Sequence, residues 1–297
     1  MQTTAVTSEA APASTHSLAV IGAGTMGTGI AQVAAQASLF VVVVDTSPEA
    51  LARSSAALKG NVEKAAAKGL LGDSSASDVT SGVTFSTDMA SVGAAGFIIE
   101  AIVEDLTAKQ RLLTQLSAIA APSVVFGTNT SSISVTKIAA AVADPSRVVG
   151  LHFFNPVPVM SLVEVVRGER TSDATLTAAL DLARRLGKTP IEVQDAPGFV
   201  SNRLLMPMIN EAVFCLAEGV ANRDAIDEVM RLGMAHPMGP LRLADLIGLD
   251  VCLSIMETLQ HDLGDDKYRP APLLRRLVAA GKLGRKSNEG FYSYPAG

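Results

Sequence analysis

The stretch LAVIGAGTMGTGIAQVAAQA, residues 18–37, contains a short apolar run, a turn with glycines and an apolar helical pattern. We interpret it as a strand, a turn and a helix. Gly22, Gly24 and Gly27 have the spacing GxGxxG, which is a weak signal by itself in a chain with 24 glycines. Between a strand and a helix, such glycines permit a tight turn and let backbone amides approach a pyrophosphate. The stretch therefore predicts a dinucleotide-binding turn, in which Thr25 and Met26 are further candidate contacts.

A second apolar run, LFVVVV at residues 39–44, ends at Asp45. A carboxylate at this place accepts hydrogen bonds from a ribose 2′-hydroxyl and repels a 2′-phosphate. Thr46 and Ser47 follow, with no arginine close behind. The sequence therefore favours NAD over NADP as the cofactor. The alternative is that the glycines only pack a turn and that Asp45 only caps one.

Further apolar runs follow, and helical patterns separate most of them. Strands are predicted at 83–85, 97–102, 124–128, 148–153, around Glu164 and at 189–193, and helices at about 48–68, 105–119 and 173–186. Continuous apolar strands interleaved with helices indicate a parallel sheet with helices on both faces. The predicted fold class is α/β, with a doubly wound sheet of the Rossmann type.

The pattern changes after DAPG at residues 195–198, because helical spacing runs on from Phe199 with Pro207 as an expected kink. Further helical segments lie near 222–232, 241–259 and 271–281. A chain of 297 residues is long enough for two hydrophobic cores. We therefore expect three parts, which are a disordered tail at 1–16, a nucleotide-binding domain at 17–196 and an all-helical domain at 197–297.

The composition narrows the classes of partner. A formal charge of -5 argues against nucleic acid or an anionic membrane, since both attract basic surfaces. No apolar run is long enough to span a membrane, and the first 16 residues lack the features of a signal peptide. The two cysteines, Cys215 and Cys252, lie in apolar helical patterns without the spacing of a metal site, which suits buried thiols in the cytoplasm.

The segment GLHFFNPVPVMSLVEVV, residues 150–166, places His152 and Glu164 in two apolar runs. His152 falls near the end of a predicted strand, and ligands of open α/β sheets bind outside the carboxyl ends of the strands. An unpaired carboxylate at Glu164 would be costly to bury, so a hydrogen bond to His152 resolves that cost. Such a bond also orients an imidazole to remove an alcohol proton. We interpret the pair as catalytic; the alternative is a satisfied core histidine.

Residues 17–297 resemble the short-chain L-3-hydroxyacyl-CoA dehydrogenase family. Within that family they most resemble the bacterial 3-hydroxybutyryl-CoA dehydrogenases. The resemblance rests on a series of motifs in the family's order: VIGAGTMGTGIAQ, NTSSIS, GLHFFNPVPVM, LVEVVRG, APGFVSNR, PMINEA, HPMGPLRLADLIGLD and LGRKSNEGFY. It implies a dinucleotide-binding domain, a helical domain that forms a homodimer and binds substrate, and an active site between them. The implied reaction is NAD-dependent interconversion of a 3-hydroxyacyl-CoA, such as 3-hydroxybutyryl-CoA, with the 3-oxoacyl-CoA.

The resemblance also implies roles for residues at the matching positions. His152 would be the general acid and base, and Glu164 its partner. Ser131 and Asn202 would bind the substrate oxygen and thioester region, with Asn155 in the same cleft. The resemblance implies that Glu104, Lys109 and Asn129 would bind NAD. It also implies that Lys64 and Lys68 would bind the phosphates of coenzyme A.

Other interpretations stay open for several of these residues. Ser131 and Asn202 could each cap a following helix, and Lys64 and Lys68 could simply form a solvated helix face. The whole chain could be a non-catalytic dinucleotide-binding relative, or a dehydrogenase of a free hydroxy acid. The sequence also departs from the family pattern at Ser38, where a glycine is common, and at Thr128 and Ser201, which bear on the acyl preference.

Overall fold

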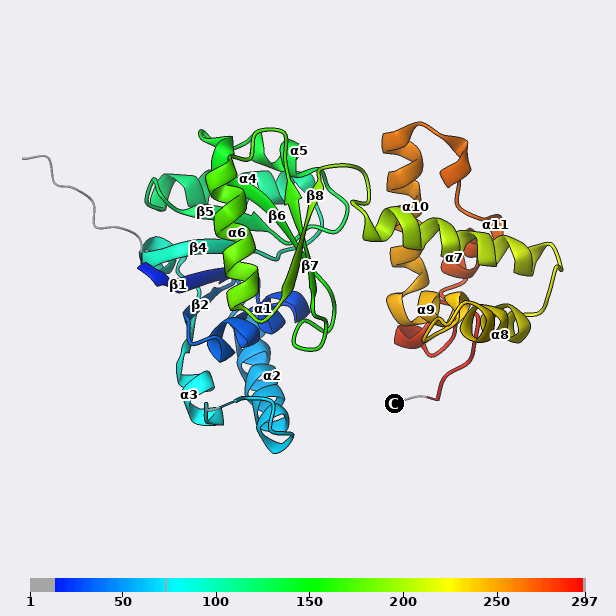
Figure 1. The fold of residues 1–297 in the computed structure, drawn as a ribbon, viewed down its shortest axis with the longest axis horizontal. Helices are drawn as coiled ribbons and strands as arrows, with labels where there is room; N and C mark the ends of the chain where they lie inside the picture. The colour runs from blue at the N-terminus through cyan, green and yellow to red at the C-terminus, as the bar shows by residue number, and fades with distance from the viewer. Residues whose placement is uncertain (1–13, 73, 296–297) are drawn as a thin grey trace, which may run out of the picture. The chain divides into compact units, whose positions relative to one another are not determined.

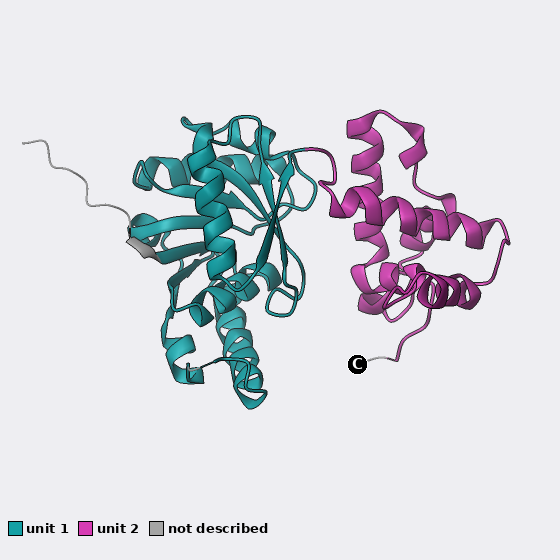
Figure 2. Cartoon of the chain, viewed as in Figure 1, with its two compact units in different colours: residues 1–195 teal, residues 196–297 magenta. Residues whose placement is uncertain are grey.

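The computed structural model describes residues 14–72 and 74–295 of the chain. The predicted tail, 1–16, lies outside these residues except for 14–16, where the first strand already begins. The chain divides into two compact units, residues 1–195 and 196–297 (Figure 2). This division falls one residue before the predicted boundary.

Unit 1 is built on an eight-stranded sheet with the order β3-β2-β1-β4-β5-β6-β7-β8 (Figure 1). The strands are β1 (Ser14–Ile21), β2 (Phe40–Val44), β3 (Val83–Ser86), β4 (Ala95–Glu100), β5 (Val125–Thr128), β6 (Val148–Phe153), β7 (Leu162–Arg167) and β8 (Thr189–Gln194). Strands β1 to β6 pair in parallel. Because β1 lies between β2 and β4, the order of the strands reverses beside it, and this is where open α/β sheets bind ligands.

Strands β7 and β8 correct the expectation of a parallel sheet. β7 pairs with β6 in the antiparallel direction, and β8 runs parallel to β7. The connection between β6 and β7 is residues 154–161, and a parallel crossover needs a dozen residues or more. The chain therefore reverses direction at this loop.

Helices cover both faces of the sheet, as the doubly wound prediction requires. They are α1 (Thr25–Gln36), α2 (Pro48–Ala67), α3 (Ala76–Ser81), α4 (Leu106–Ile119), α5 (Val135–Ala139) and α6 (Asp173–Arg185), with 3-10 turns η1 (Met89–Ala94) and η2 (Pro145–Arg147). Alternate strand residues, such as Phe97 and Ile99, share one core with α1, α2 and α6. The intervening Ile98 is equally buried, as expected for a strand that is covered on both sides.

Unit 2 is helical, and its own core includes Met206, Leu241 and Leu259. Its helices are α7 (Ser201–Ala217), α8 (Arg223–Gly233), α9 (Pro240–Ile247), α10 (Leu249–Leu263) and α11 (Pro272–Ala279), with 3-10 turns η3 (Asp266–Tyr268) and η4 (Arg285–Ser287). Helix α7 continues through Pro207. The single helix predicted at 241–259 is in fact two helices, because Gly248 adopts a φ of 106° between them.

Both cysteines are free thiols, but only Cys252 is buried, whereas Cys215 is partly exposed. Burial, together with the nearby charge of Asp250, raises the pKa of Cys252 to about 12. Within the described ranges 14–72 and 74–295, no helix has both the length and the apolar character needed to cross a membrane.

Candidate active site

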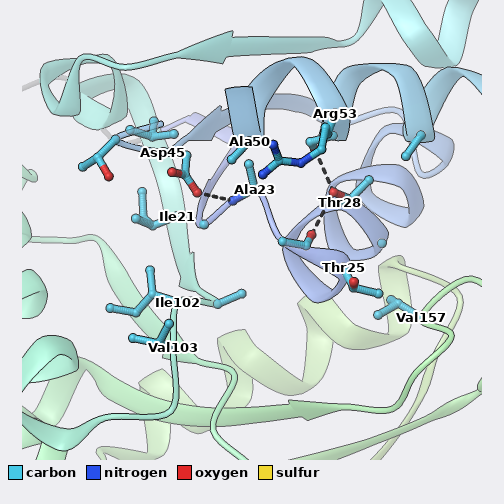
Figure 3. A pocket seen from close by; sticks show the side chains of 18 of the residues that line it. Ile21, Ala23, Thr25, Thr28, Asp45, Ala50, Arg53, Ile102, Val103 and Val157 are labelled. Atoms are coloured by element: carbon cyan, nitrogen blue, oxygen red, sulfur yellow. Dashed lines mark hydrogen bonds between the residues drawn. The ribbon is translucent and has the colours of Figure 1, made fainter. Parts of the chain in front are cut away.

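A pocket of about 800 Å³ lies in unit 1 at the carboxyl ends of β1, β2 and β4 (Figure 3). Its size is in the range of small-molecule and cofactor sites. The glycine turn, Asp45, one face of α2, the segment after β4 and the loop after β6 all contribute to its lining. The pocket therefore lies where the strand order predicts a ligand site.

The glycine turn has the backbone geometry that a dinucleotide needs. Gly22 has a φ of +106°, and a Cβ atom there would lie 2.6 Å from the carbonyl oxygen of Ala101. A Cβ atom at Gly27 would collide with the carbonyl oxygen of Gly22, whereas the space around Gly24 is open. Gly24 also precedes the first turn of α1 without a side-chain cap. The backbone amides at this helix end are therefore available to a phosphate.

The two residues inside the turn differ in position. Thr25 lines the pocket. Met26 instead packs against the hydrophobic core of unit 1. Of the two predicted contacts, the structure therefore brings only Thr25 to the pocket wall.

Asp45 is held at the rim of the pocket by its backbone surroundings. One carboxylate oxygen accepts a hydrogen bond of 2.8 Å from the amide of Ala23, and the other accepts one of 2.9 Å from the amide of Ser47. Ser47 in turn caps α2. The carboxylate is therefore fixed between the glycine turn and the start of α2, as a ribose-binding acid should be.

Sequence reasoning missed the contribution of α2. Arg53 and Asn61 of α2 line the pocket, and Figure 3 labels Arg53 among the lining side chains. The helical spacing of Ala57, Asn61, Lys64 and Lys68 could have indicated this face, since residues three and four apart are neighbours on a helix. Lys64 and Lys68 are exposed where α2 ends.

His152 and Glu164 occupy directly opposite positions on β6 and β7. Their side chains therefore extend from the same face of the sheet, where opposite Cβ atoms are about 5 Å apart. The Nδ1 atom of His152 lies 2.8 Å from Oε2 of Glu164, and both residues are buried. Because a carboxylate accepts hydrogen bonds, the ring donates to Glu164 through Nδ1–H, and Nε2 is the other ring nitrogen at which a proton can be exchanged.

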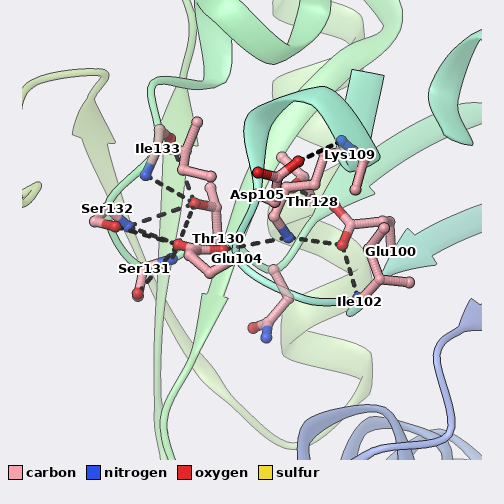
Figure 4. A network of polar contacts seen from close by, with 12 residues as sticks. Glu100, Ile102, Glu104, Asp105, Lys109, Thr128, Thr130, Ser131, Ser132 and Ile133 are labelled. Carbon is pink, nitrogen blue, oxygen red and sulfur yellow. Dashed lines mark hydrogen bonds and ion pairs between the residues drawn. The ribbon is translucent and has the colours of Figure 1, made fainter. Parts of the chain in front are cut away.

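A buried ion-pair network lies beside the NTSS segment (Figure 4). Lys109, which is completely buried on α4, donates to Glu100 at 2.7 Å and pairs with Glu104 at 3.3 Å. Glu100 also accepts from the hydroxyl of Thr128 at 2.7 Å and from the amide of Ile102 at 2.8 Å. Thr128, which departs from the family pattern, is therefore part of this buried network.

The Glu104 carboxylate fixes the NTSS segment. Its Oε1 atom accepts hydrogen bonds from the Thr130 hydroxyl at 2.7 Å and from the Ser131 and Ser132 amides at 2.8 and 3.1 Å. Burial raises the pKa of Glu104, but the charge of Lys109 and the bonds from Thr130 and Ser131 outweigh it and leave that pKa below its ordinary value. An ionised Glu104 thus holds the predicted substrate residue Ser131 in place.

The asparagines near β6 have different surroundings. The side-chain oxygen of Asn129 accepts a hydrogen bond of 3.0 Å from the amide of Phe153, which ties the NTSS segment to the residue after His152. Asn155 lines the pocket and precedes a cis peptide bond to Pro156. Asn129 therefore lies close to His152 in space, and Asn155 follows it by three residues in the sequence.

The structure rules out two of the alternative roles. The helix after NTSS, α5, is capped by the side chain of Ser134, so Ser131 is not its cap. Asn202 lies inside the first turn of α7, whose N-cap position is Val200. Asn202 is buried in unit 2, while the other predicted catalytic residues belong to unit 1.

Two family models match the chain. Residues 17–196 match the model described as "3-hydroxyacyl-CoA dehydrogenase, NAD binding domain", and residues 198–294 match the model described as "3-hydroxyacyl-CoA dehydrogenase, C-terminal domain". Together they cover nearly all of the described residues, and they meet where the two units meet.

Individual relatives agree with these models. A probable 3-hydroxybutyryl-CoA dehydrogenase of Deinococcus radiodurans is 53% identical over 93% of this chain and 99% of its own length. The 3-hydroxybutyryl-CoA dehydrogenase of Bradyrhizobium diazoefficiens is 46% identical over 93% of this chain and 94% of its own. Among solved structures, an (S)-3-hydroxybutyryl-CoA dehydrogenase from Ralstonia eutropha has a TM-score of 0.92 at 46% identity, covering 95% of this chain and all of the other.

Proposed function

Because the chain belongs to the 3-hydroxyacyl-CoA dehydrogenase family and is an NAD-dependent dehydrogenase of that family, we propose that it interconverts L-3-hydroxybutyryl-CoA and acetoacetyl-CoA with His152 and Glu164 as its acid and base pair. The observation that carries this proposal is the 2.8 Å contact between His152 and Glu164 across β6 and β7. It provides a braced imidazole in the same unit as the dinucleotide pocket.

The residues present fit NAD. The glycine turn leaves space for a pyrophosphate at Gly24, and Asp45 offers a carboxylate to a ribose diol. When bound, the nicotinamide supplies hydride transfer to and from the substrate carbon that bears the oxygen. Glu104, Lys109 and Asn129 are proposed on the nicotinamide side of this site.

The proton moves through His152. In the oxidation direction, its Nε2 atom removes the proton of the 3-hydroxyl group, and in reduction the imidazolium returns it. Glu164 accepts the hydrogen bond from Nδ1–H throughout, so it fixes the ring orientation and stabilises the imidazolium that forms. The charge created on the ring is therefore balanced within the pair.

The remaining predicted residues would bind the acyl-CoA. Ser131 and Asn202 would hold the 3-oxygen and the thioester region, and Asn155 would also contact the substrate. Glu104 supports this role for Ser131, because it fixes the backbone on both sides of that hydroxyl. Lys64 and Lys68, exposed at the end of α2, would pair with coenzyme A phosphates.

We further propose that the protein is a cytoplasmic homodimer. The free thiols of Cys215 and Cys252 are compatible with a reducing compartment. Unit 2 exposes a group of large apolar side chains on and around α8, namely Val220, Val229, Leu232 and Met234. Such a surface is typical of an association site, and it supports dimer formation through the helical unit.

A steady-state panel tests the proposal. Purified protein is mixed with NADH or NADPH and with acetoacetyl-CoA, longer 3-oxoacyl-CoA thioesters or free acetoacetate, and oxidation of the nicotinamide is followed by absorbance. We expect turnover with NADH and acetoacetyl-CoA, and much weaker turnover with NADPH because Asp45 repels its 2′-phosphate. Saturable NADH binding without turnover of any thioester would instead indicate a non-catalytic relative. A preference for free acetoacetate would indicate a hydroxy-acid dehydrogenase.

A further inference from the structure

Lys188 is a buried cation that none of the roles above uses. It lies three residues past the end of α6, and the helix end fixes its backbone: the amide of Gly187 bonds to the carbonyl of Arg184, and the amide of Lys188 bonds to that of Ala183. This pairing is the Schellman motif, with Gly187 in the left-handed region at a φ of 72°. Lys188 as a whole residue is only 9% exposed.

The ammonium group of Lys188 is bound by the loop between β6 and β7. Nζ donates to the carbonyl oxygen of Val157 at 2.5 Å and to that of Met160 at 2.9 Å. In the part of the chain that the structure describes, no carboxylate pairs with Lys188. Burial accordingly lowers its pKa. A cation that is buried against neutral carbonyls costs free energy, so its position calls for a compensating role.

The loop that Lys188 binds forms one wall of the dinucleotide pocket. Asn155, Pro156, Val157 and Pro158 all line that pocket. Val157 is buried against α1, where a Cβ atom added to Gly29 would lie 2.8 Å from the Cβ of Val157. The same loop connects His152 to Glu164 along the chain. A shift of the loop would therefore alter the pocket wall.

We propose that Lys188 is a positioning residue, whose ammonium group holds residues 154–161 in the conformation that forms the dinucleotide pocket. It touches neither cofactor nor substrate and acts through the carbonyls of Val157 and Met160. The identity of the ligand as NAD rests on the proposed function. The proposed role of Lys188 concerns binding of the dinucleotide, so it can be measured in the absence of catalytic turnover.

The test compares Lys188→Met with Lys188→Arg, and uses Lys59→Met, at an exposed lysine of α2, as the matched control. The dissociation constant for NADH is measured by fluorescence titration, well below the melting temperature of each variant. Lys188→Met should raise it by about tenfold or more, because two buried carbonyls lose a charged donor. Lys188→Arg keeps donors and should restore most of the affinity, while Lys59→Met should bind NADH like the unmodified protein.

Hydrogen exchange supplies a second readout. The amides of Val159 and Met160 both bond to the carbonyl of Pro156 inside the loop, and they should exchange faster in Lys188→Met. Where Lys188→Met does not fold, Lys188→Gln, which keeps a neutral donor, takes its place. NADH affinity and loop exchange that are unchanged in a folded variant overturn the proposal. A protein that binds NADH but reduces no thioester would overturn the proposed function alone.

Discussion

His152 and Glu164 face each other because β6 and β7 run in opposite directions and pair these two residues directly. A shift of the register by one residue would move Glu164 to the other face of the sheet. The chemistry proposed for the pair therefore depends on the short loop that reverses the chain. The cost of burying a carboxylate was enough to predict the contact from sequence, whereas the antiparallel pairing that produces it was not anticipated.

Ser38 stands where the family commonly has a glycine, and a serine at this position strains the backbone. It lies at the end of α1 with a φ of 58°, in a Schellman motif where the amide of Leu39 bonds to the carbonyl of Ala34. Side chains are strained in this region. Ser38→Gly should stabilise the protein by up to about 1 kcal/mol, since relief of strain exceeds the entropy that glycine adds to the unfolded chain.

Urea unfolding measures this difference. Ser38→Ala is the control, because alanine removes the hydroxyl and keeps the strained backbone. A gain in stability for alanine that equals the gain for glycine would contradict the explanation from backbone strain.

Some residues near the site could not be identified from the sequence. Lys188 looks like an ordinary lysine after a helix, and only the folded loop shows which carbonyls it binds. Arg53 and Asn61 share a helix face with Lys64 and Lys68, but the sequence does not show that this face of α2 lines the dinucleotide pocket. By contrast, GxGxxG and Asp45 were recognisable because a tight turn and a strand end are local features of the chain.

Buried charged side chains join the ends of β4 and β5 to the start of α4. Glu100, Lys109 and Glu104 link these elements to the NTSS segment. Removing one partner of a buried ion pair leaves an uncompensated charge. Lys109, which the family pattern suggests as a cofactor contact, is completely buried and reaches the site through Glu104.

The lowered pKa of Glu104 makes its contribution to stability depend on pH. A depressed folded pKa means that the contribution is fully present above the unfolded value of about 4.5 and is lost as pH falls through the folded pKa. Glu104→Gln should therefore be less stable than the unmodified protein near neutral pH, and the difference should shrink below about pH 4.5.

Denaturant unfolding across this pH range measures the difference. Glu192→Gln, at an exposed glutamate of β8, is the matched control and should show a small and nearly constant effect. A Glu104→Gln deficit that stays the same from neutral to acidic pH would show that the charge of Glu104 does not stabilise the fold.

The helices and strands were mostly predictable, and the exceptions have local causes. Strand β6 has the predicted bounds, because its apolar run is continuous and ends at prolines. The helix predicted at 241–259 breaks at Gly248, since the apolar period continues on both sides of a glycine with positive φ. The direction of β7 depends on the length of a loop, which apolar periodicity does not report.

The molecule as a whole consists of two units with separate cores, and the apolar period of the sequence changes close to the division between them, after DAPG. The association proposed for unit 2 concerns Leu232, which is 73% exposed on α8. Leu232→Glu should convert a dimer into monomers, because a buried interface does not accept an unpaired carboxylate. Sedimentation velocity gives the mass of the particle directly.

Leu70→Glu is the control, since Leu70 is 68% exposed in unit 1. This variant should sediment like the unmodified protein. If Leu232→Glu and Leu70→Glu both sediment like the unmodified protein, the dimer interface does not include Leu232.

We propose that His152 moves the proton of the reaction and that Glu164 holds the His152 ring in position. The most direct measurement is the turnover number of His152→Gln with acetoacetyl-CoA and saturating NADH, together with its NADH dissociation constant. We expect turnover to fall by about 10²- to 10⁴-fold while NADH binding stays nearly unchanged. A folded His152→Gln protein that turns over at close to the unmodified rate would contradict this proposal.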